Sequence, residues 1–245
     1  MKVNKKWMGV LLMLLFLNAS VAFGADVSAE VDLNSAYVWR GLTFNDGLVA
    51  QPSLDVTSGG LDLNVWANYD LDSYDGTVDK YEFSEVDLTM SYSHSLGPVD
   101  VTGGIIEYLF PATKTSDAQQ TQEVFLGISK ELFTGFTAGA TGYYDFDQVD
   151  DYYLNPYIDY SLDLGKGFSM DFGASCGVAG KKFSEIDSGG TQGGFHEYTL
   201  TIGSGYTVGA YTFSANIGYT DSLKKAVLPN TDVHLFGGAG VSVAF

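Results

Sequence analysis

Two-residue alternation of apolar and polar side chains runs through almost the whole chain after residue 25. In segment 61–71, for example, Leu61, Leu63 and Val65 alternate with Asp62 and Asn64. A period of two is that of a β-strand with one apolar and one polar face, and helix-type spacing is not evident after residue 25. The sequence therefore predicts an all-β fold whose strands separate an apolar from a polar environment.

Breaks in this pattern are of two kinds, which take turns along the chain. Tight glycine-containing turns lie at 58–60, 96–98, 133–135, 165–167 and 208–210. Longer polar connections lie near 41–48, 72–81, 110–121, 147–151, 181–194 and 222–231. Short turns at one end and long loops at the other are typical of outer-membrane barrels. The sequence predicts an antiparallel up-and-down barrel of about twelve strands, with both termini on the short-turn side.

The position of the aromatic residues on the apolar face separates a membrane barrel from a soluble β-protein. Near the tight turns this face carries Tyr92, Phe136, Tyr160, Phe168, Tyr206, Tyr211 and Phe245. Near the long loops it carries Tyr37, Trp39, Tyr69, Tyr144, Tyr152, Tyr198 and Tyr219. Small and aliphatic residues lie between the two bands. Aromatic girdles around an aliphatic band suit a lipid bilayer, whereas a soluble core would place its aromatic residues in the middle.

The first residues have the composition of an export signal. Lys2, Lys5 and Lys6 precede an apolar run, and small residues before Ala25 suit cleavage after Ala22 or Gly24. This pattern predicts a cleaved signal peptide over 1–24 and a barrel over 25–245. Cys176 is the single cysteine, so no intramolecular disulfide is expected.

Three apolar-face residues have further implications. Phe245 ends an alternating apolar series and resembles the C-terminal signature by which barrels are recognised for insertion, which predicts the barrel-assembly machinery and outer-membrane lipid as partners. Pro52 and Pro156 fall within strands, where each lacks a ladder N–H, so we expect bulges or strand ends there.

Residues 29–43 contain Tyr37, Trp39, Arg40, Gly41, Leu42 and Thr43 in the order Tyr-x-Trp-Arg-Gly-Leu-Thr. This segment resembles the start of an uncharacterised family of predicted outer-membrane barrels, whose first strand ends in a Tyr-x-Trp/Phe-Arg-Gly-Ile/Leu-Ser/Thr motif. The resemblance implies an exported barrel. It implies no activity and assigns no functional residue.

Charge favours cations as partners. The chain has 12 basic and 30 acidic residues, and loss of three leader lysines leaves 9 − 30 = −21. This charge argues against nucleic acid as a partner. Alternation places about a dozen acids on the polar face with Arg40 as the one inward basic residue, a salt-bridge partner for the carboxylates. The acids that we expect to select cations in the lumen are Asp32, Glu85, Asp87, Asp145 and Asp159. They could equally be a solvated polar lining.

Inward aromatic residues have two interpretations. Trp66, Tyr143, Tyr153 and Tyr157 could form a stacking track for a ring-bearing solute, or they could fill a small lumen, which we favour.

The histidines and the acidic loops are the remaining candidates for a catalytic or metal site. His196 and His234 lie near loop ends with Glu197 and Asp232 beside them, but no nucleophile motif accompanies them, so we expect no catalysis. Acidic loops 70–76 and 145–151 lack the spacing of a calcium loop, so we expect no metal and no cofactor.

The sequence thus favours passive passage of small solutes, with cations preferred, through an outer-membrane barrel. The alternative is a closed barrel whose extracellular loops bind a partner or stabilise the envelope. A channel of this kind predicts that loop acids such as Asp75 and Asp187 influence ion selectivity less than the lumen acids.

Overall fold

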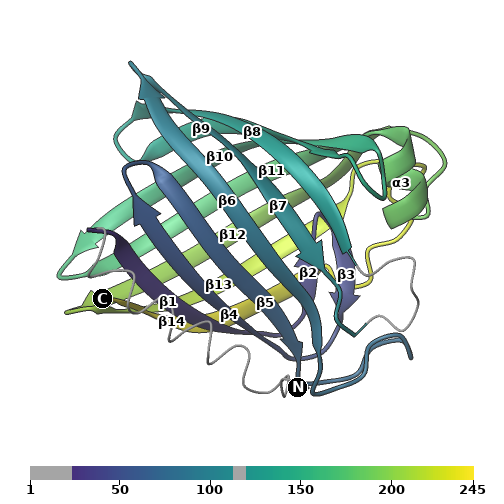
Figure 1. The fold of residues 1–245 in the computed structure, drawn as a ribbon, viewed down its shortest axis with the longest axis horizontal. Coiled ribbons are helices and arrows are strands. Elements are labelled where there is room, and N and C mark those ends of the chain that lie inside the picture. The colour runs from purple at the N-terminus through teal and green to yellow at the C-terminus, as the bar shows by residue number, and fades with distance from the viewer. Residues whose placement is uncertain (1–23, 113–119) are drawn as a thin grey trace, which may run out of the picture.

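Neighbouring strands of the chain pair with one another throughout, and the first barrel strand pairs with the last. The computed structural model describes residues 24–112 and 120–245. Within this part, twelve antiparallel strands close into a barrel (Figure 1). The barrel strands are β1 (Asp26–Asn34), β4 (Val49–Ser58), β5 (Leu61–Asp70), β6 (Phe83–Leu96), β7 (Val99–Leu109), β8 (Gln120–Phe133), β9 (Phe136–Asp145), β10 (Asp151–Gly165), β11 (Phe168–Ala179), β12 (Gly194–Val208), β13 (Tyr211–Ser222) and β14 (Leu235–Ala244). The predicted fold class and strand number are confirmed.

The connections alternate as the sequence predicts. Five tight turns lie at one end of the barrel and the longer connections at the other (Figure 1). Gly59 and Gly97 have positive φ values of 59° and 66° in two of the tight turns, a backbone conformation that glycine adopts without strain. The long-loop end carries a second, two-stranded sheet of β2 (Tyr37–Trp39) and β3 (Leu42–Asn45), and the helix α3 (Lys181–Asp187).

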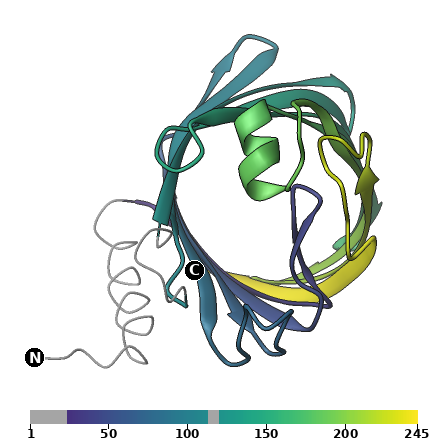
Figure 2. The same cartoon turned by 90° about the vertical axis from the view of Figure 1, so that its right-hand side faces the viewer.

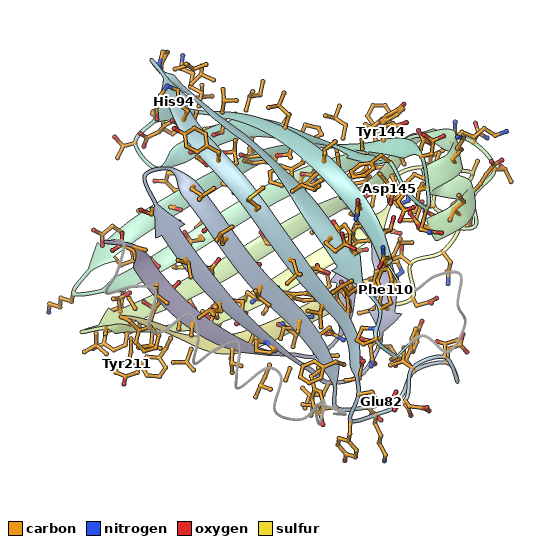
Figure 3. All side chains as sticks on the ribbon, in the orientation of Figure 1. Glu82, His94, Phe110, Tyr144, Asp145 and Tyr211 are labelled. Atoms are coloured by element: carbon orange, nitrogen blue, oxygen red, sulfur yellow. The ribbon has the colours of Figure 1, made fainter. Side chains whose placement is uncertain are left out.

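The outward face is a belt of exposed apolar side chains. Tyr211 and Phe245 are 53% and 60% exposed near the tight turns, and Tyr144 and Tyr152 are 42% and 49% exposed near the loops. Figure 3 shows the labelled Tyr211 and Tyr144 at opposite ends of the barrel. An exposed apolar surface this extensive suits a lipid environment and not water.

Among the described residues, the structure has no helix of the length and apolar character needed to cross a membrane.

The prolines do not cause the expected bulges. Pro52 pairs with Val31 of β1, and Pro156 pairs with Ala140 of β9. On its other side each proline interrupts the ladder for two residues, but the register is the same before and after the gap. The strands run straight past both prolines because a missing N–H removes one hydrogen bond without requiring an extra residue.

Candidate functional site

The residues of the Tyr-x-Trp-Arg-Gly motif form a hairpin inside the barrel. The β2–β3 hairpin leaves the wall after β1 and lies in the lumen at the long-loop end (Figure 2). Arg40 and Gly41 form its two-residue turn with φ values of 49° and 75°. Positive φ at both central residues is the requirement of a type I′ hairpin turn. Tyr37 and Trp39, expected in the outward aromatic girdle, therefore point into the lumen.

Arg40, at the hairpin tip, reaches the opposite wall. Its Nη1 and Nη2 donate hydrogen bonds of 2.8 and 2.7 Å to the two carboxylate oxygens of Glu123 on β8. Both side chains are almost fully buried, with exposures of 7% and 4%. A bidentate pair of this kind fixes both the position and the orientation of the guanidinium.

Four aromatic rings surround the same guanidinium. The Arg40 Cζ lies 4.1 Å from the Trp39 ring centroid, 4.4 Å from that of Tyr143 and 4.3 Å from that of Tyr153. The Phe183 ring, from α3, lies at 5.5 Å. Cation–π attraction strengthens when the cation is shielded from water, so the aromatic cage adds to the ion pair with Glu123.

Two further polar contacts anchor the hairpin to the wall formed by β5 and β6. The Tyr37 hydroxyl donates to Glu85 Oε2 at 2.9 Å. Asn45 Nδ2, fully buried, donates to Asp70 Oδ1 at 2.7 Å. The hairpin is thus attached through both strands at its base and through Arg40 at its tip.

Gly41 allows the closest approach. A Cβ built at this position would lie 2.9 Å from Glu197 Cβ and 3.1 Å from Leu228 Cδ2. A larger residue at the tip would push the hairpin away from β12, so the motif glycine is required both for its φ value and for its small size.

A bulge on β12 turns two consecutive side chains inward. The β11–β12 register shifts by one residue between the pairs Cys176–Tyr198 and Val178–Phe195. In this bulge two residues of β12, His196 and Glu197, lie opposite one residue of β11, Gly177. Their exposed fractions are 0% and 2%. Glu197 accepts a hydrogen bond from Tyr153 and contacts His196 Nδ1 at 2.6 Å, and His196 Nε2 lies 2.6 Å from Ser188 Oγ. Strict alternation could not place both residues inside.

The order Ser188–His196–Glu197 is that of a nucleophilic triad, but its surroundings are those of a structural network. His196 is completely buried, and the second oxygen of Glu197 is occupied by Tyr153. Ser188 does not line either of the two cavities described below. No group of three or more His, Cys, Asp and Glu residues in 24–112 and 120–245 is arranged to hold a metal ion.

Helix α3 packs on the hairpin. The sequence pattern predicted only a long polar connection at 181–194 and no helix there. Its N-terminal N–H groups, those of Lys182 and Phe183, donate to Asp151 Oδ2 on β10 at 2.7 and 3.1 Å. Phe183 is 1% exposed and contacts Trp39 and Tyr153. The cap comes from a residue 31 positions before Lys182, so no local start signal marks the helix.

Asp187 at the end of α3 was expected to be a remote loop acid. Asp187 is exposed to solvent, and it interacts electrostatically with Arg40, Asp145 and Glu123. Desolvation raises the pKa of Asp187 to about 7, and the nearby acids add to this effect while Arg40 opposes it. Asp187 is therefore not remote from the Arg40–Glu123 pair but interacts with it at the mouth of the barrel.

The structure places the five proposed selectivity acids on the lumen side in two groups. Glu85, Asp87 and Asp145 are engaged or enclosed near the hairpin: Asp145 Oδ1 accepts from the N–H groups of Asp147 and Val149, and Asp87 Oδ1 is buried without a hydrogen bond in the described residues. The Asp32 side chain lies over Gly240, its pairing partner on β14, and Asp159 lines a cavity. Figure 3 shows Asp145 at the α3 end.

The four residues predicted to be inward aromatic side chains also fall into two groups. Tyr143 and Tyr153 belong to the cage of Arg40, and Trp66 packs against Tyr37 with ring centroids 5.5 Å apart. Tyr157 lies over Gly139, where a Cβ would meet its ring at 2.5 Å. Three of the four therefore pack against the hairpin or its anchor.

Lumen residues line two neighbouring cavities. The first, of about 290 Å³, lies beneath the hairpin, and the second, of about 370 Å³, lies along β10–β13. Asn216 lines both. No lysine or arginine of the described residues lines either one, so an acidic and uncharged polar surface adjoins the remaining space.

Comparisons with known proteins agree with this architecture. A family model described as "Bacterial protein of unknown function (Gcw_chp)" matches residues 18–186. No curated protein matches the chain in sequence.

Solved porin structures share the fold at low identity. The NanC porin is 10% identical with a TM-score of 0.55, covering 88% of this chain and 98% of its own. An outer-membrane channel from Pseudomonas putida F1 is 10% identical with a TM-score of 0.57, covering 91% and 96%. The KdgM porin, solved in complex with disordered oligogalacturonate, is 9% identical with a TM-score of 0.55, covering 90% and 99%.

Proposed function

The chain belongs to the Gcw_chp family of bacterial proteins of unknown function, and we propose that it is a passive outer-membrane channel for small solutes that prefers cations. The observation that carries the proposal is the charge of the lumen. Arg40 is the one basic side chain of the described residues that is buried in the lumen, and Glu123 neutralises it. Asp32, Asp159 and Asp171 face the lumen, and none of them forms an ion pair with a basic side chain in 24–112 or 120–245. Acidic pore linings concentrate cations and repel anions.

The hairpin narrows such a channel at its extracellular end without filling it. Its polar anchors lie on β5, β6 and β8, and its tip packs against Glu197 of β12. One cavity lies along β10–β13, and the other lies beneath the base of the hairpin between β13, β14, β1, β4 and β5. Asn216 of β13 borders both cavities, which supports a passage beneath the hairpin along the wall of β12–β14. Side chains along that wall are small, with Gly203, Gly205, Gly238 and Gly240 among them.

The second candidate is a closed barrel with a structural or partner-binding role for its loops. The anchored hairpin is the specific observation that favours it, because three side-chain anchors with four hydrogen bonds hold the hairpin across the mouth. Buried polar networks of this kind make a structure rigid. The two candidates differ in whether ions pass.

Ion conductance of the purified mature protein in a planar bilayer tests the proposal. The channel predicts discrete, ohmic current steps in potassium chloride. The closed barrel predicts no current steps. Heat-modifiable migration on a gel verifies that the protein used is folded. Silent recordings at every salt concentration with folded protein would reject the channel and favour the second candidate.

Export and assembly form part of the same proposal. We propose a leader cleaved near residue 24, insertion into outer-membrane lipid, and recognition by the barrel-assembly machinery through the last strand. Phe245 is 60% exposed on the outward face, and its N–H donates to Val27 O across the closing seam. Deletion of Phe245 should leave export intact and leave the chain in the periplasm. Normal assembly of the truncated chain would remove this part of the proposal.

A further inference from the structure

The cavity beneath the hairpin combines aromatic faces with side-chain amides. Its volume is about 290 Å³, near the lower end of small-molecule sites. Its aromatic walls are Tyr37, Trp66 and Phe236, and its amides are Asn34, Gln51 and Asn216. Tyr37 and Trp66 meet at an interplanar angle of 54°, so they form a corner and not a flat stack.

Hydrogen bonds within the wall reduce the donors that this cavity can offer. Asn34 Nδ2 donates to Gln51 Oε1 at 2.8 Å, and Gln51 Nε2 donates to Asn68 Oδ1 at 3.0 Å. The Tyr37 hydroxyl donates to Glu85. The cavity thus presents aromatic faces, whose electrostatic potential attracts cations, and few free N–H or O–H groups for an anion.

The adjoining cavity supplies negative charge. Asp159 and Asp171 line it together with Ser161 and Thr201, and Asn216 joins it to the first cavity. Asp171 Oδ1 accepts the Ser161 hydroxyl at 2.6 Å, and neither aspartate forms an ion pair among the described residues. Ionised carboxylates carry negative charge and only accept hydrogen bonds, so these two side chains attract a cation and repel an anion.

We propose that these two cavities form one binding path for a small organic cation of the ammonium class. The cation binds first in the aromatic corner at Trp66 and then moves past Asn216 to Asp159 and Asp171. This inference rests on the proposed channel function and names its solute class. The aromatic corner distinguishes an organic cation from a bare metal ion, and the aspartates distinguish it from a neutral polyol.

Calorimetric titration of the folded mature protein in detergent tests the binding step without requiring conduction. The probes are tetraethylammonium chloride, glucose as a neutral solute and sodium chloride at matched ionic strength. Tetraethylammonium should bind with saturation, and the other two should not. Trp66→Leu and the double variant Asp159→Asn/Asp171→Asn should each weaken binding by about tenfold. Tyr157 and Asp62 line neither cavity, so Tyr157→Leu and Asp62→Asn serve as matched controls.

The outcomes separate this inference from the channel itself. Conductance in a bilayer together with no tetraethylammonium binding would overturn the inference and leave the channel intact. Saturable binding without conductance would overturn the channel and leave the binding site. Equal binding of glucose, or loss of binding in the controls to the same degree as in the test variants, would overturn the ammonium assignment.

Discussion

Arg40 and Glu123 are separated by 83 residues, and they join the tip of an inward hairpin to the far wall of the barrel through two hydrogen bonds. The pair is almost inaccessible to water. Its energetic importance lies in what remains when one partner is removed, because an unpaired buried charge is far more costly than a missing pair.

Arg40→Ala should therefore release the hairpin and destabilise the protein. We expect a loss of about 3–5 kcal/mol, the usual effect of leaving one buried charge unpaired, and a larger single-channel conductance. Arg40→Lys should rescue only part of this effect because an ammonium cannot donate the bidentate pair. Thermal unfolding and bilayer recordings measure the two effects.

A paired substitution provides the control for Arg40. Arg40→Met with Glu123→Gln removes both charges and keeps similar volumes, so it should be less destabilising than Arg40→Ala alone. If Arg40→Ala neither lowers stability nor alters conductance, the hairpin is not held by this pair.

Gly41→Ala and Gly59→Ala form a matched test of the hairpin tip. Both glycines have positive φ, so alanine costs about 1–2 kcal/mol of backbone strain at each. Only at Gly41 would the new Cβ meet other atoms, at 2.9 Å, whereas nothing lies within 4 Å at Gly59. Overpacking should add about 1–3 kcal/mol to the cost at Gly41, measured by thermal unfolding. Equal losses at the two positions would show that the tip is not tightly packed.

The docking of α3 should weaken at alkaline pH. The pKa of Asp187 is raised to about 7, so its contribution to stability is complete below its unfolded value of about 4 and is lost as pH rises through about 7. With Trp66→Phe, Trp39 is the remaining tryptophan of the mature chain and lies 6.1 Å from the Phe183 ring. Its fluorescence should change with a midpoint near pH 7, and Asp187→Asn should abolish the change. A transition that persists in Asp187→Asn but disappears in the loop control Asp75→Asn would contradict this assignment.

Surface accessibility tests the orientation. Gly76 lies in a long loop and Gly97 in a tight turn at the other end, and a Cβ at either meets no atom within 4 Å. An epitope tag inserted at Gly76 should be accessible to antibody on intact cells, and the same tag at Gly97 should be accessible only after permeabilisation. The reverse result would invert the barrel.

Periodicity was sufficient for the wall of the barrel because lipid and lumen impose a strict alternation on every strand. It failed at Tyr37 and Trp39, because an inward hairpin is also extended and continues the alternation of β1 after the chain has left the wall. Nothing local to the motif shows that Ser35 and Ala36 redirect the backbone.

The rest of the site depends on contacts between distant segments. The bulge that turns His196 and Glu197 inward is a property of two strands together, and Asp151 caps α3 from another strand. One signal was available in the sequence: Arg40 is the single basic residue expected in an acidic lumen, and the structure places it at the centre of the network. Nothing in the sequence distinguishes its partner Glu123 from the other acidic residues.

The most direct test of the account is the reversal potential of the wild-type channel under a potassium chloride gradient. We predict cation preference that declines as ionic strength rises, because salt shortens the Debye length from about 10 Å at 0.1 M to about 3 Å at 1 M. Asp32→Asn/Asp159→Asn should move the reversal potential towards zero, and the loop control Asp75→Asn should leave it nearly unchanged. Anion preference of the folded wild-type protein would contradict the account, since it would mean that the unpaired lumen carboxylates do not face the path that ions take.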